Sequence, residues 1–467
     1  YRWYMSDKPQ IKLAEAVVLI DAAFLNFVIT DIKGYFEETL HRSLQEIDLS
    51  MLTTYITLDA GISGLSIAQL LSGHNNVTIF EADSRPGGMV KCDRVNGHLF
   101  HRTGGHVFNT KRQDVLDWFW KHFSRETEFI KADRNSVVSM GDGRIIPYPI
   151  ENHAYKFNDR MMKSFINDLI VMARKDNVEP MNFEDFLKQR FGKTLYYEYF
   201  QPYNEKIWRK SLADVSLSWL EGKLPMPTLE EIIYNNFNHV EEKQFVHSTF
   251  YYEKKDGSQF LANRLAEGLN IHYNMKADKI EKTTMGWKVN GEECDRVIFC
   301  GNIKELPAIL YGIDIEPYRA DIDALEAHGT TTVLCEIEKN PYSWIYMPSR
   351  DHRSHRIICT GNFAESNCAK GKMSATIEFT DFIDKGEILD NLTRIPFSPR
   401  YLCHHYEAFT YPIQNKDTRK HISDLKFCLE TSGIYLLGRF AEWEYYNMDV
   451  AMGAALDLYN NKLVRKL

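Results

Sequence analysis

The segment from residue 53 to residue 88 constrains the fold more than any other part of the 467-residue chain. Apolar residues favour strands over 55–58 and 77–80, and a glycine turn followed by a helix-like run over 65–71 lies between them. Strand, turn, helix and strand in this order open a βαβ unit. We therefore predict an α/β fold that contains a Rossmann-like dinucleotide-binding domain.

The turn itself carries the residue types that a dinucleotide site needs. It reads Leu-Asp-Ala-Gly-Ile-Ser-Gly-Leu over 58–65. Gly61 lets the backbone approach a pyrophosphate, and Gly64 lets the helix pack closely on the strand. Glu81 ends the second strand, where a carboxylate can accept a hydrogen bond from a ribose hydroxyl. We expect cofactor contacts from Gly61, Ser63, Gly64 and Glu81.

One residue of the turn departs from the pattern G-x-G-x-x-G. Asp59 stands where the first glycine is usual, so a negative charge lies close to the expected pyrophosphate. Repulsion between like charges is costly in a partly dehydrated site. We therefore expect Asp59 to weaken dinucleotide binding and Asp59→Gly to strengthen it, with the fold intact.

Composition excludes several other classes of function. A formal net charge of -8 argues against nucleic acid as a partner. The eight cysteines form no C-x-x-C pair, which predicts free thiols and no metal site. The nearest approach to a membrane span, 16–30, is interrupted by Asp21 and Asn26. We expect a soluble cytoplasmic protein without an integral membrane segment.

The length of the chain exceeds what one hydrophobic core usually organises. Amphipathic runs over 115–123 and 161–175 predict a helix-rich region, strand-like segments follow, and a strand over 434–437 with a helix from about Asp449 closes the chain. We expect a helical insertion and an antiparallel β-sheet substrate domain beside the dinucleotide-binding domain. The predicted parts are 1–52 (an appendage), 53–110 with about 245–310 and 425–467 (dinucleotide-binding), 111–244 (helical) and 311–424 (β-sheet).

Two more glycine turns favour FAD over NAD. They are Ser84-Arg85-Pro86-Gly87-Gly88-Met89 and Gly104-Gly105-His106-Val107-Phe108. With them, the chain from about Thr53 resembles the UDP-galactopyranose mutases, within the class of FAD enzymes that includes protoporphyrinogen and amine oxidases. Residues 202–208 are similar to the uridine-side segment of that family, and residues 438–449 to its C-terminal flavin and diphosphate segment.

The resemblance implies roles for single residues. His106 and Arg439 are the catalytic candidates beside the reacting edge of the flavin, although His106 could equally donate to a backbone carbonyl and Arg439 could form a surface salt bridge. Further implied cofactor contacts are Arg85, Gly87, Gly88, Gly105, Gly438, Arg439 and Met448. Implied substrate contacts are Tyr203, Trp208, Lys223, Tyr411, Tyr445 and Asn447, for which core packing, a plain turn or a helix cap are the alternatives.

The resemblance also implies an activity. Reduced FAD acts in that family as the nucleophile at the anomeric carbon of a nucleotide sugar, which exchanges its pyranose and furanose forms for surface polysaccharide synthesis. NAD(P)H is a candidate reductant, and a homo-oligomer is an open expectation. Three features depart from the family. The loop 219–225 offers Lys223 instead of an arginine, the strand 331–336 offers no second arginine for the diphosphate, and Asn447 stands at an acidic position of the C-terminal segment.

Two other functions stay open. A conventional FAD oxidase or dehydrogenase of the amine-oxidase or protoporphyrinogen-oxidase type would take hydride from its substrate. A noncatalytic descendant with impaired FAD binding would keep the fold alone, and Asp59 and the missing arginine favour it. Residues up to about Ala60 lie outside the resemblance, so we hypothesise that the first strand derives from a different small protein.

Overall fold

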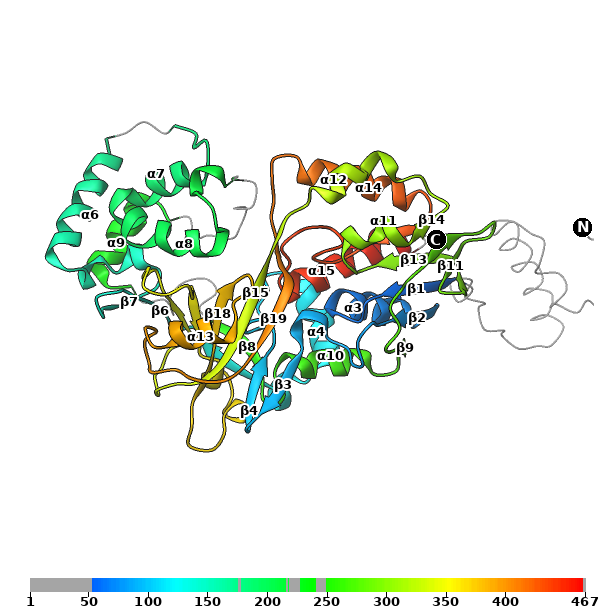
Figure 1. Ribbon diagram of the computed structural model, residues 1–467, viewed down its shortest axis with the longest axis horizontal. Helices are drawn as coiled ribbons and strands as arrows, with labels where there is room; N and C mark the ends of the chain where they lie inside the picture. Colours follow the sequence, from blue (N-terminus) through cyan, green and yellow to red (C-terminus); the bar gives the residue numbers. More distant parts are fainter. Residues whose placement is uncertain (1–52, 175–177, 216, 218–226, 241–248, 465–467) are drawn as a thin grey trace, which may run out of the picture. The chain divides into compact units, whose positions relative to one another are not determined.

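The computed structural model describes residues 53–174, 178–215, 217, 227–240 and 249–464 (Figure 1). All of them belong to one compact unit, Met51–Leu467. The predicted appendage 1–52 and the predicted substrate ligand Lys223 lie outside the described residues. The described part is a mixed α/β structure, which confirms the predicted fold class.

A five-stranded parallel sheet contains the predicted βαβ unit. Its order is β20-β13-β1-β2-β9, so β1, the strand that leads into the predicted glycine turn, lies at its centre. Leu58 pairs with Phe80 on one side and with Phe299 on the other. The strands are β1 (Thr54–Leu58), β2 (Asn76–Phe80), β9 (Asn270–His272), β13 (Arg296–Phe299) and β20 (Ile434–Leu436).

The alternation of side chains along β1 explains its central position. Tyr55 faces a core that includes Ile67 and Leu458 from the helices, whereas Ile56 and Leu58 face a core on the other side of the sheet. Successive side chains of a strand point to opposite faces of the sheet. A strand whose residues are apolar on both faces suits a sheet that is covered on both sides.

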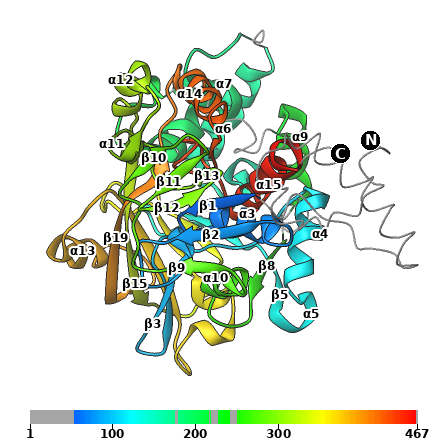
Figure 2. The same ribbon diagram turned by 90° about the vertical axis from the view of Figure 1, so that its right-hand side faces the viewer.

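Helix α3 (Ile62–Leu71) follows β1, and seven of its ten residues are buried. It packs against the C-terminal helix α15 (Met448–Leu458), as Figure 2 shows. Helices α4 (Gln113–His122) and α10 (Ser258–Ala266) complete this layer. The layer places the N-terminal ends of α3 and α15 near the same edge of the sheet.

A seven-stranded sheet forms the second large layer, in the order β19-β15-β18-β17-β16-β6-β7. Its neighbours pair antiparallel except β16 and β6, which are parallel. The strands are β6 (Ser136–Ser139), β7 (Ile145–Pro147), β15 (Ala327–Glu336), β16 (Trp344–Tyr346), β17 (Arg356–Ile358), β18 (Ser374–Thr380) and β19 (Arg400–Pro412). Helix α13 (Lys385–Leu392) covers part of one face.

The helical region forms a group of its own beyond β6 and β7 in Figure 1. Asn158, Asn182 and Thr228 accept backbone N–H groups and so begin three of its helices. The helices are α6 (Asp159–Met172), α7 (Phe183–Leu195), α8 (Gln201–Trp208) and α9 (Leu229–Asn238). The predicted helical range 111–244 also contains strands β5, β6 and β7, which the sequence analysis did not predict. Strand β5 pairs with β8 and β6 with β16, both distant in sequence, and β7 extends the sheet from β6.

Short elements complete the described part. No helix in the described ranges is long and apolar enough to cross a membrane. The remaining elements are β3 (Cys92–Val95), β4 (His98–His101), α5 (Arg125–Glu128), β5 (Phe129–Asp133), β8 (Thr249–Glu253), β10 (Ile280–Lys282), β11 (Trp287–Val289), β12 (Glu292–Cys294), α11 (Leu306–Ile309), β14 (Leu310–Tyr311), α12 (Arg319–Asp323) and α14 (Thr418–Glu430).

Candidate functional site

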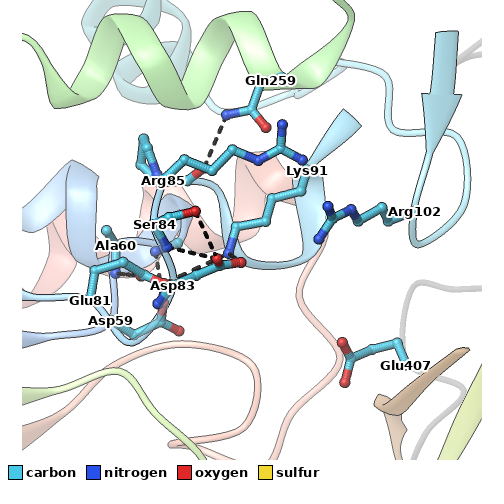
Figure 3. Close-up of polar contacts among 12 residues, drawn as sticks. Asp59, Ala60, Glu81, Asp83, Ser84, Arg85, Lys91, Arg102, Gln259 and Glu407 are labelled. Carbon is cyan, nitrogen blue, oxygen red and sulfur yellow. Dashed lines mark hydrogen bonds and ion pairs between the residues drawn. The ribbon is translucent and has the colours of Figure 1, made fainter. Parts of the chain in front are cut away.

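The turn between β1 and α3 brings two carboxylates to two backbone amides. The Ala60 N–H donates to Glu81 Oε2 at 2.7 Å, and the Gly61 N–H donates to Asp59 Oδ1 at 3.0 Å (Figure 3). Asp59 has a φ of 87°, in the left-handed region that favours glycine. The predicted position of the missing first glycine is therefore the point at which the backbone turns.

Close backbone approaches explain the other glycines. A Cβ on Gly64 would lie 2.0 Å from the carbonyl oxygen of Asp59. A Cβ on Gly88 would lie 3.3 Å from the Gly61 Cα, and one on Gly438 would lie 2.9 Å from the Ser63 Oγ. Three glycine-containing segments thus converge on the N-terminal turn of α3, which has no side-chain cap among the described residues.

Glu81 is buried and already holds several partners. Its Oε1 accepts from the Asp83 N–H at 2.9 Å, and the Lys91 ammonium lies 3.7 Å away. The same ammonium pairs with Asp83 at 2.7 Å (Figure 3). Burial and the neighbouring Glu81 carboxylate raise the pKa of Asp59 to about 8, and Lys91 opposes this rise.

The second glycine turn is fixed from two sides. Gln259 of α10 donates to the Pro86 carbonyl at 3.0 Å. Arg85 pairs with Asp93 at 2.5 Å, and Arg102 pairs with the same carboxylate at 2.6 Å. Arg85 therefore lies at the edge of the turn and shares the Asp93 carboxylate with Arg102. From this position its side chain could contact a phosphate or a ribose.

His106 of the third glycine turn is held by the protein itself. Its Nε2 lies 3.1 Å from the Met89 carbonyl oxygen, which can only accept, so Nε2 carries the hydrogen. Burial, and next the Arg439 charge, lower the pKa of His106 to about 4. The ring is neutral at pH 7 and is oriented by the turn that precedes it.

The third turn also approaches the seven-stranded sheet closely. A Cβ on Gly105 would lie 2.7 Å from an Ile358 methyl group, and one on Gly104 would lie 2.7 Å from Glu378 Oε1. Only glycines allow this approach. The turn therefore places His106 between the dinucleotide turn and strands β17 and β18.

Arg356 lies at this junction and was not identified from the sequence. It opens β17 and forms an ion pair with Glu378, which lies opposite on β18. Its Nη2 donates to the Tyr411 hydroxyl at 2.9 Å. Burial opposes ionisation of Glu378, but Arg356 and His355 outweigh it and lower the pKa of Glu378 to about 2. The two side chains form a charged pair within the sheet.

Arg439 and two tyrosines lie next to this pair. The Tyr411 and Tyr445 rings stack at 5.5 Å with an interplanar angle of 7°. The Arg439 guanidinium lies 4.7 Å from the Tyr445 ring centre, and its Nη1 donates to the Thr410 carbonyl at 2.9 Å. Backbone carbonyls of Thr410 and Tyr446 therefore hold Arg439.

The uridine-side candidates separate. Tyr203 lies 6.3 Å from His355 and 5.6 Å from Tyr346, measured between ring centres, and so borders the Arg356 cluster. Trp208, the last residue of α8, packs in the core of the helical region, and its carbonyl oxygen lies 3.1 Å from His328 Nε2.

The last two candidates lie at the start of α15. Asn447 precedes the helix as an exposed N-terminal residue, without a side-chain cap hydrogen bond, and Met448 is buried in the core beside α3. The first N–H groups of a helix have no acceptor within it, so the start of α15 offers free backbone donors.

Arg356 and Glu378 carried a signal in the sequence. Glu378 interrupts the run Ser-Ala-Thr-Ile-Glu-Phe-Thr, which is otherwise free of charge, and Arg356 opens another apolar strand. Charged residues in strands that are buried usually have a partner. The pairing of the two strands, which is not visible in the sequence, connects them.

These residues fit a flavin dinucleotide with one exception. Three glycine-containing segments leave the N-terminal turn of α3 open to a ligand, and Glu81 directly follows β2, in the position of a ribose acceptor. The exception is the Asp59 carboxylate on the Gly61 N–H. No cluster of three or more metal-binding side chains occurs among the residues that the structure describes.

Two family models match the sequence. The model of the family described as flavin containing amine oxidoreductase matches residues 62–352. The model of a family of unknown function (DUF6621) matches residues 10–81. Strand β1 and Asp59 thus lie within the second match only, which agrees with the hypothesis that the first strand has a separate origin.

Individual proteins match over most of the chain. A dTDP-fucopyranose mutase of Escherichia coli is 24% identical over 431 residues, covering 87% of this chain and 99% of that protein. A UDP-galactopyranose mutase of Mycoplasma pneumoniae is 25% identical over 420 residues, covering 86% and 94%. The crystal structure of reduced UDP-galactopyranose mutase superposes with a TM-score of 0.78 at 22% identity, covering 89% and 96%.

Proposed function

The chain belongs to the family of flavin containing amine oxidoreductases, and from this we propose that it is an FAD-dependent mutase that interconverts the pyranose and furanose forms of a nucleotide sugar. Family membership makes it a flavoenzyme of the mutase or oxidoreductase type. Two relatives named as mutases match it over nearly their whole length, which favours the mutase.

The observation that carries the proposal is the cluster of Arg356, Arg439, Tyr411 and Tyr445 beside His106. Two guanidinium groups and two phenol hydroxyls are the groups that bind a diphosphate. An oxidase that accepts hydride from an amine needs no such cluster.

Each side chain has a task in this proposal. Arg356 provides a fixed positive charge. The Tyr411 hydroxyl oxygen accepts a hydrogen bond from Arg356 Nη2, so the hydroxyl hydrogen remains able to donate to a ligand. Arg439 is oriented by backbone carbonyls. Together they would bind the diphosphate leaving group and orient the sugar.

The cofactor contributes the chemistry that these side chains lack. When bound in the reduced state, FAD supplies the nucleophile for the sugar. Gly61, Ser63, Gly64, Gly87, Gly88 and Gly438 would hold its diphosphate side, and Gly105, His106 and Met448 its ring side. Neutral His106, whose Nε2–H is engaged by Met89, positions the turn and does not act as an acid at pH 7.

Nucleotide binding separates the mutase from the oxidase. We expect millimolar UDP or dTDP to raise the melting temperature of the purified chain by several degrees, because a ligand that binds only the folded state stabilises it. Uridine, which lacks the diphosphate, is the matched control and should have little effect. Equal melting temperatures with and without either diphosphate would refute nucleotide-sugar binding.

We further propose a role in surface polysaccharide synthesis, with NAD(P)H as the source of electrons. Oxidation of an amine by the same fold is the second candidate, favoured by the family match over 62–352. It predicts reduction of bound flavin by an amine under anaerobic conditions, which a mutase would not show.

A further inference from the structure

The Asp59 carboxylate already accepts a backbone N–H to which a bound phosphate could otherwise hydrogen-bond. Its Oδ1 accepts the Gly61 N–H at 3.0 Å, at the residue that precedes α3. A Cβ on Gly88, from the second glycine turn, would lie 3.9 Å from the same oxygen. The carboxylate thus lies in the gap between the two glycine turns (Figure 3).

This gap is where an anion gains most from the helix. The N-terminal N–H groups of a helix have no partner within it and carry a partial positive charge. Phosphate groups of dinucleotides bind at such positions, as does a carboxylate that caps the helix. A carboxylate and a diphosphate cannot both occupy the Gly61 N–H.

The surroundings of Asp59 determine its charge. Glu81 faces it from the end of β2, Lys91 from the segment after the second glycine turn, and the Cys300 thiol from the end of β13. Lys91 is shared with Glu81 and Asp83. The carboxylates of Asp59, Glu81 and Asp83 therefore share one ammonium, which favours a proton on Asp59.

We propose that the ionised Asp59 carboxylate competes with the diphosphate of FAD for the N-terminus of α3, so that FAD binds the form of the chain in which Asp59 is protonated. This inference rests on the flavin part of the proposed function. The competition accounts for the strained backbone at this position: Asp59 has a φ of 87°, and its carboxylate accepts the Gly61 N–H.

The proposal has a defined pH dependence. Burial and Glu81 raise the pKa of Asp59 to about 8, so the side chain is mostly neutral at pH 7 and ionised at pH 9. The diphosphate of FAD is anionic at both pH values. One linked proton weakens binding by about tenfold between pH 7 and pH 9.

The test measures FAD binding to the full chain by quenching of flavin fluorescence, at pH 6, 7, 8 and 9. Asp59→Gly removes the charge and the backbone strain, whereas Asp59→Asn removes the charge and keeps the size and the tolerance of positive φ. Asp278→Asn changes the net charge equally at an exposed position between β9 and β10 and serves as the matched control.

We expect the dissociation constant of the wild type and of Asp278→Asn to rise about tenfold from pH 7 to pH 9. Both Asp59 variants should show a flat profile, with Asp59→Gly the tightest. Calorimetry at pH 8 in two buffers of different ionisation enthalpy should report proton uptake for the wild type and Asp278→Asn, and none for the two Asp59 variants.

Three outcomes would overturn the inference. Equal affinities of wild type and Asp59→Gly at pH 9, or the same pH slope in the Asp59 variants, would refute it and leave the flavin assignment intact. Failure of every variant to bind FAD, with circular dichroism showing folded protein, would refute both the inference and the proposed function.

Discussion

The Arg356 guanidinium and the Glu378 carboxylate form an ion pair across the neighbouring strands β17 and β18. The Glu378 side chain is 2% exposed, and Arg356 continues the chain of contacts to Tyr411. The Glu378 carboxylate therefore orients the Arg356 guanidinium toward Tyr411, in the cluster that we assign to the diphosphate.

Removal of Arg356 should destabilise the fold. Arg356→Met leaves the Glu378 charge buried without its cation, which costs about 3–5 kcal/mol in the free energy of unfolding. Urea denaturation at pH 7 measures this loss. The double variant Arg356→Met/Glu378→Gln should recover part of it, because the remaining group is neutral. A single variant within about 0.5 kcal/mol of wild type would contradict the pairing.

The Tyr411 hydroxyl should act on substrate binding. Tyr411→Phe keeps the ring that stacks on Tyr445 and removes only the acceptor of Arg356. We expect the KM for the nucleotide sugar to rise about tenfold to a hundredfold, since one hydrogen bond to a charged group contributes about 1.5–3 kcal/mol. Steady-state kinetics with Tyr401→Phe, in the distant part of β19, as the control tests this. An unchanged KM would remove Tyr411 from the site.

His106 should make the fold sensitive to acid. Its pKa is lowered to about 4, below the ordinary value of 6.5, so the unfolded chain binds more protons than the folded chain between these values. This contribution to stability is present above pH 6.5 and is lost as the pH falls toward 4. His106→Gln should flatten the decline in melting temperature over that window. A parallel decline in both proteins would contradict the burial of a neutral ring.

Gly64 should be the least replaceable residue of the helix. A Cβ there would meet the Asp59 carbonyl oxygen at 2.0 Å, whereas a Cβ on Gly73 meets nothing within 4 Å. We expect Gly64→Ala to lower the free energy of unfolding by more than about 2 kcal/mol and Gly73→Ala to change it by less than about 1 kcal/mol. Thermal unfolding of both variants measures the difference, and equal effects would rule out the close approach.

Local pattern predicted the parts of the fold that local pattern determines. The alternation over 55–58 and 77–80 and the apolar run after Gly61 predicted β1, β2 and α3 to within a few residues. The C-terminal helix, expected from about Asp449, begins at Met448. Each of these elements shows its own period of apolar residues.

Tertiary pairing determined what the sequence analysis missed. Strands β5 and β6 lie within the predicted helical range because β5 pairs with β8 and β6 with β16, more than 100 residues away. The sequence resemblance placed a second arginine on β15, whereas Arg356 contacts Glu378 and Tyr411 from β17. No local pattern contains either relationship.

Turnover tests the central claim most directly. The purified chain is loaded with FAD at pH 7, reduced anaerobically with dithionite, and incubated with UDP-galactopyranose or dTDP-fucopyranose, and the products are separated by chromatography. The account predicts conversion of at least one substrate to its furanose form with reduced flavin and none with oxidised flavin. Bound, reduced flavin that converts neither nucleotide sugar, at any enzyme concentration, would contradict it.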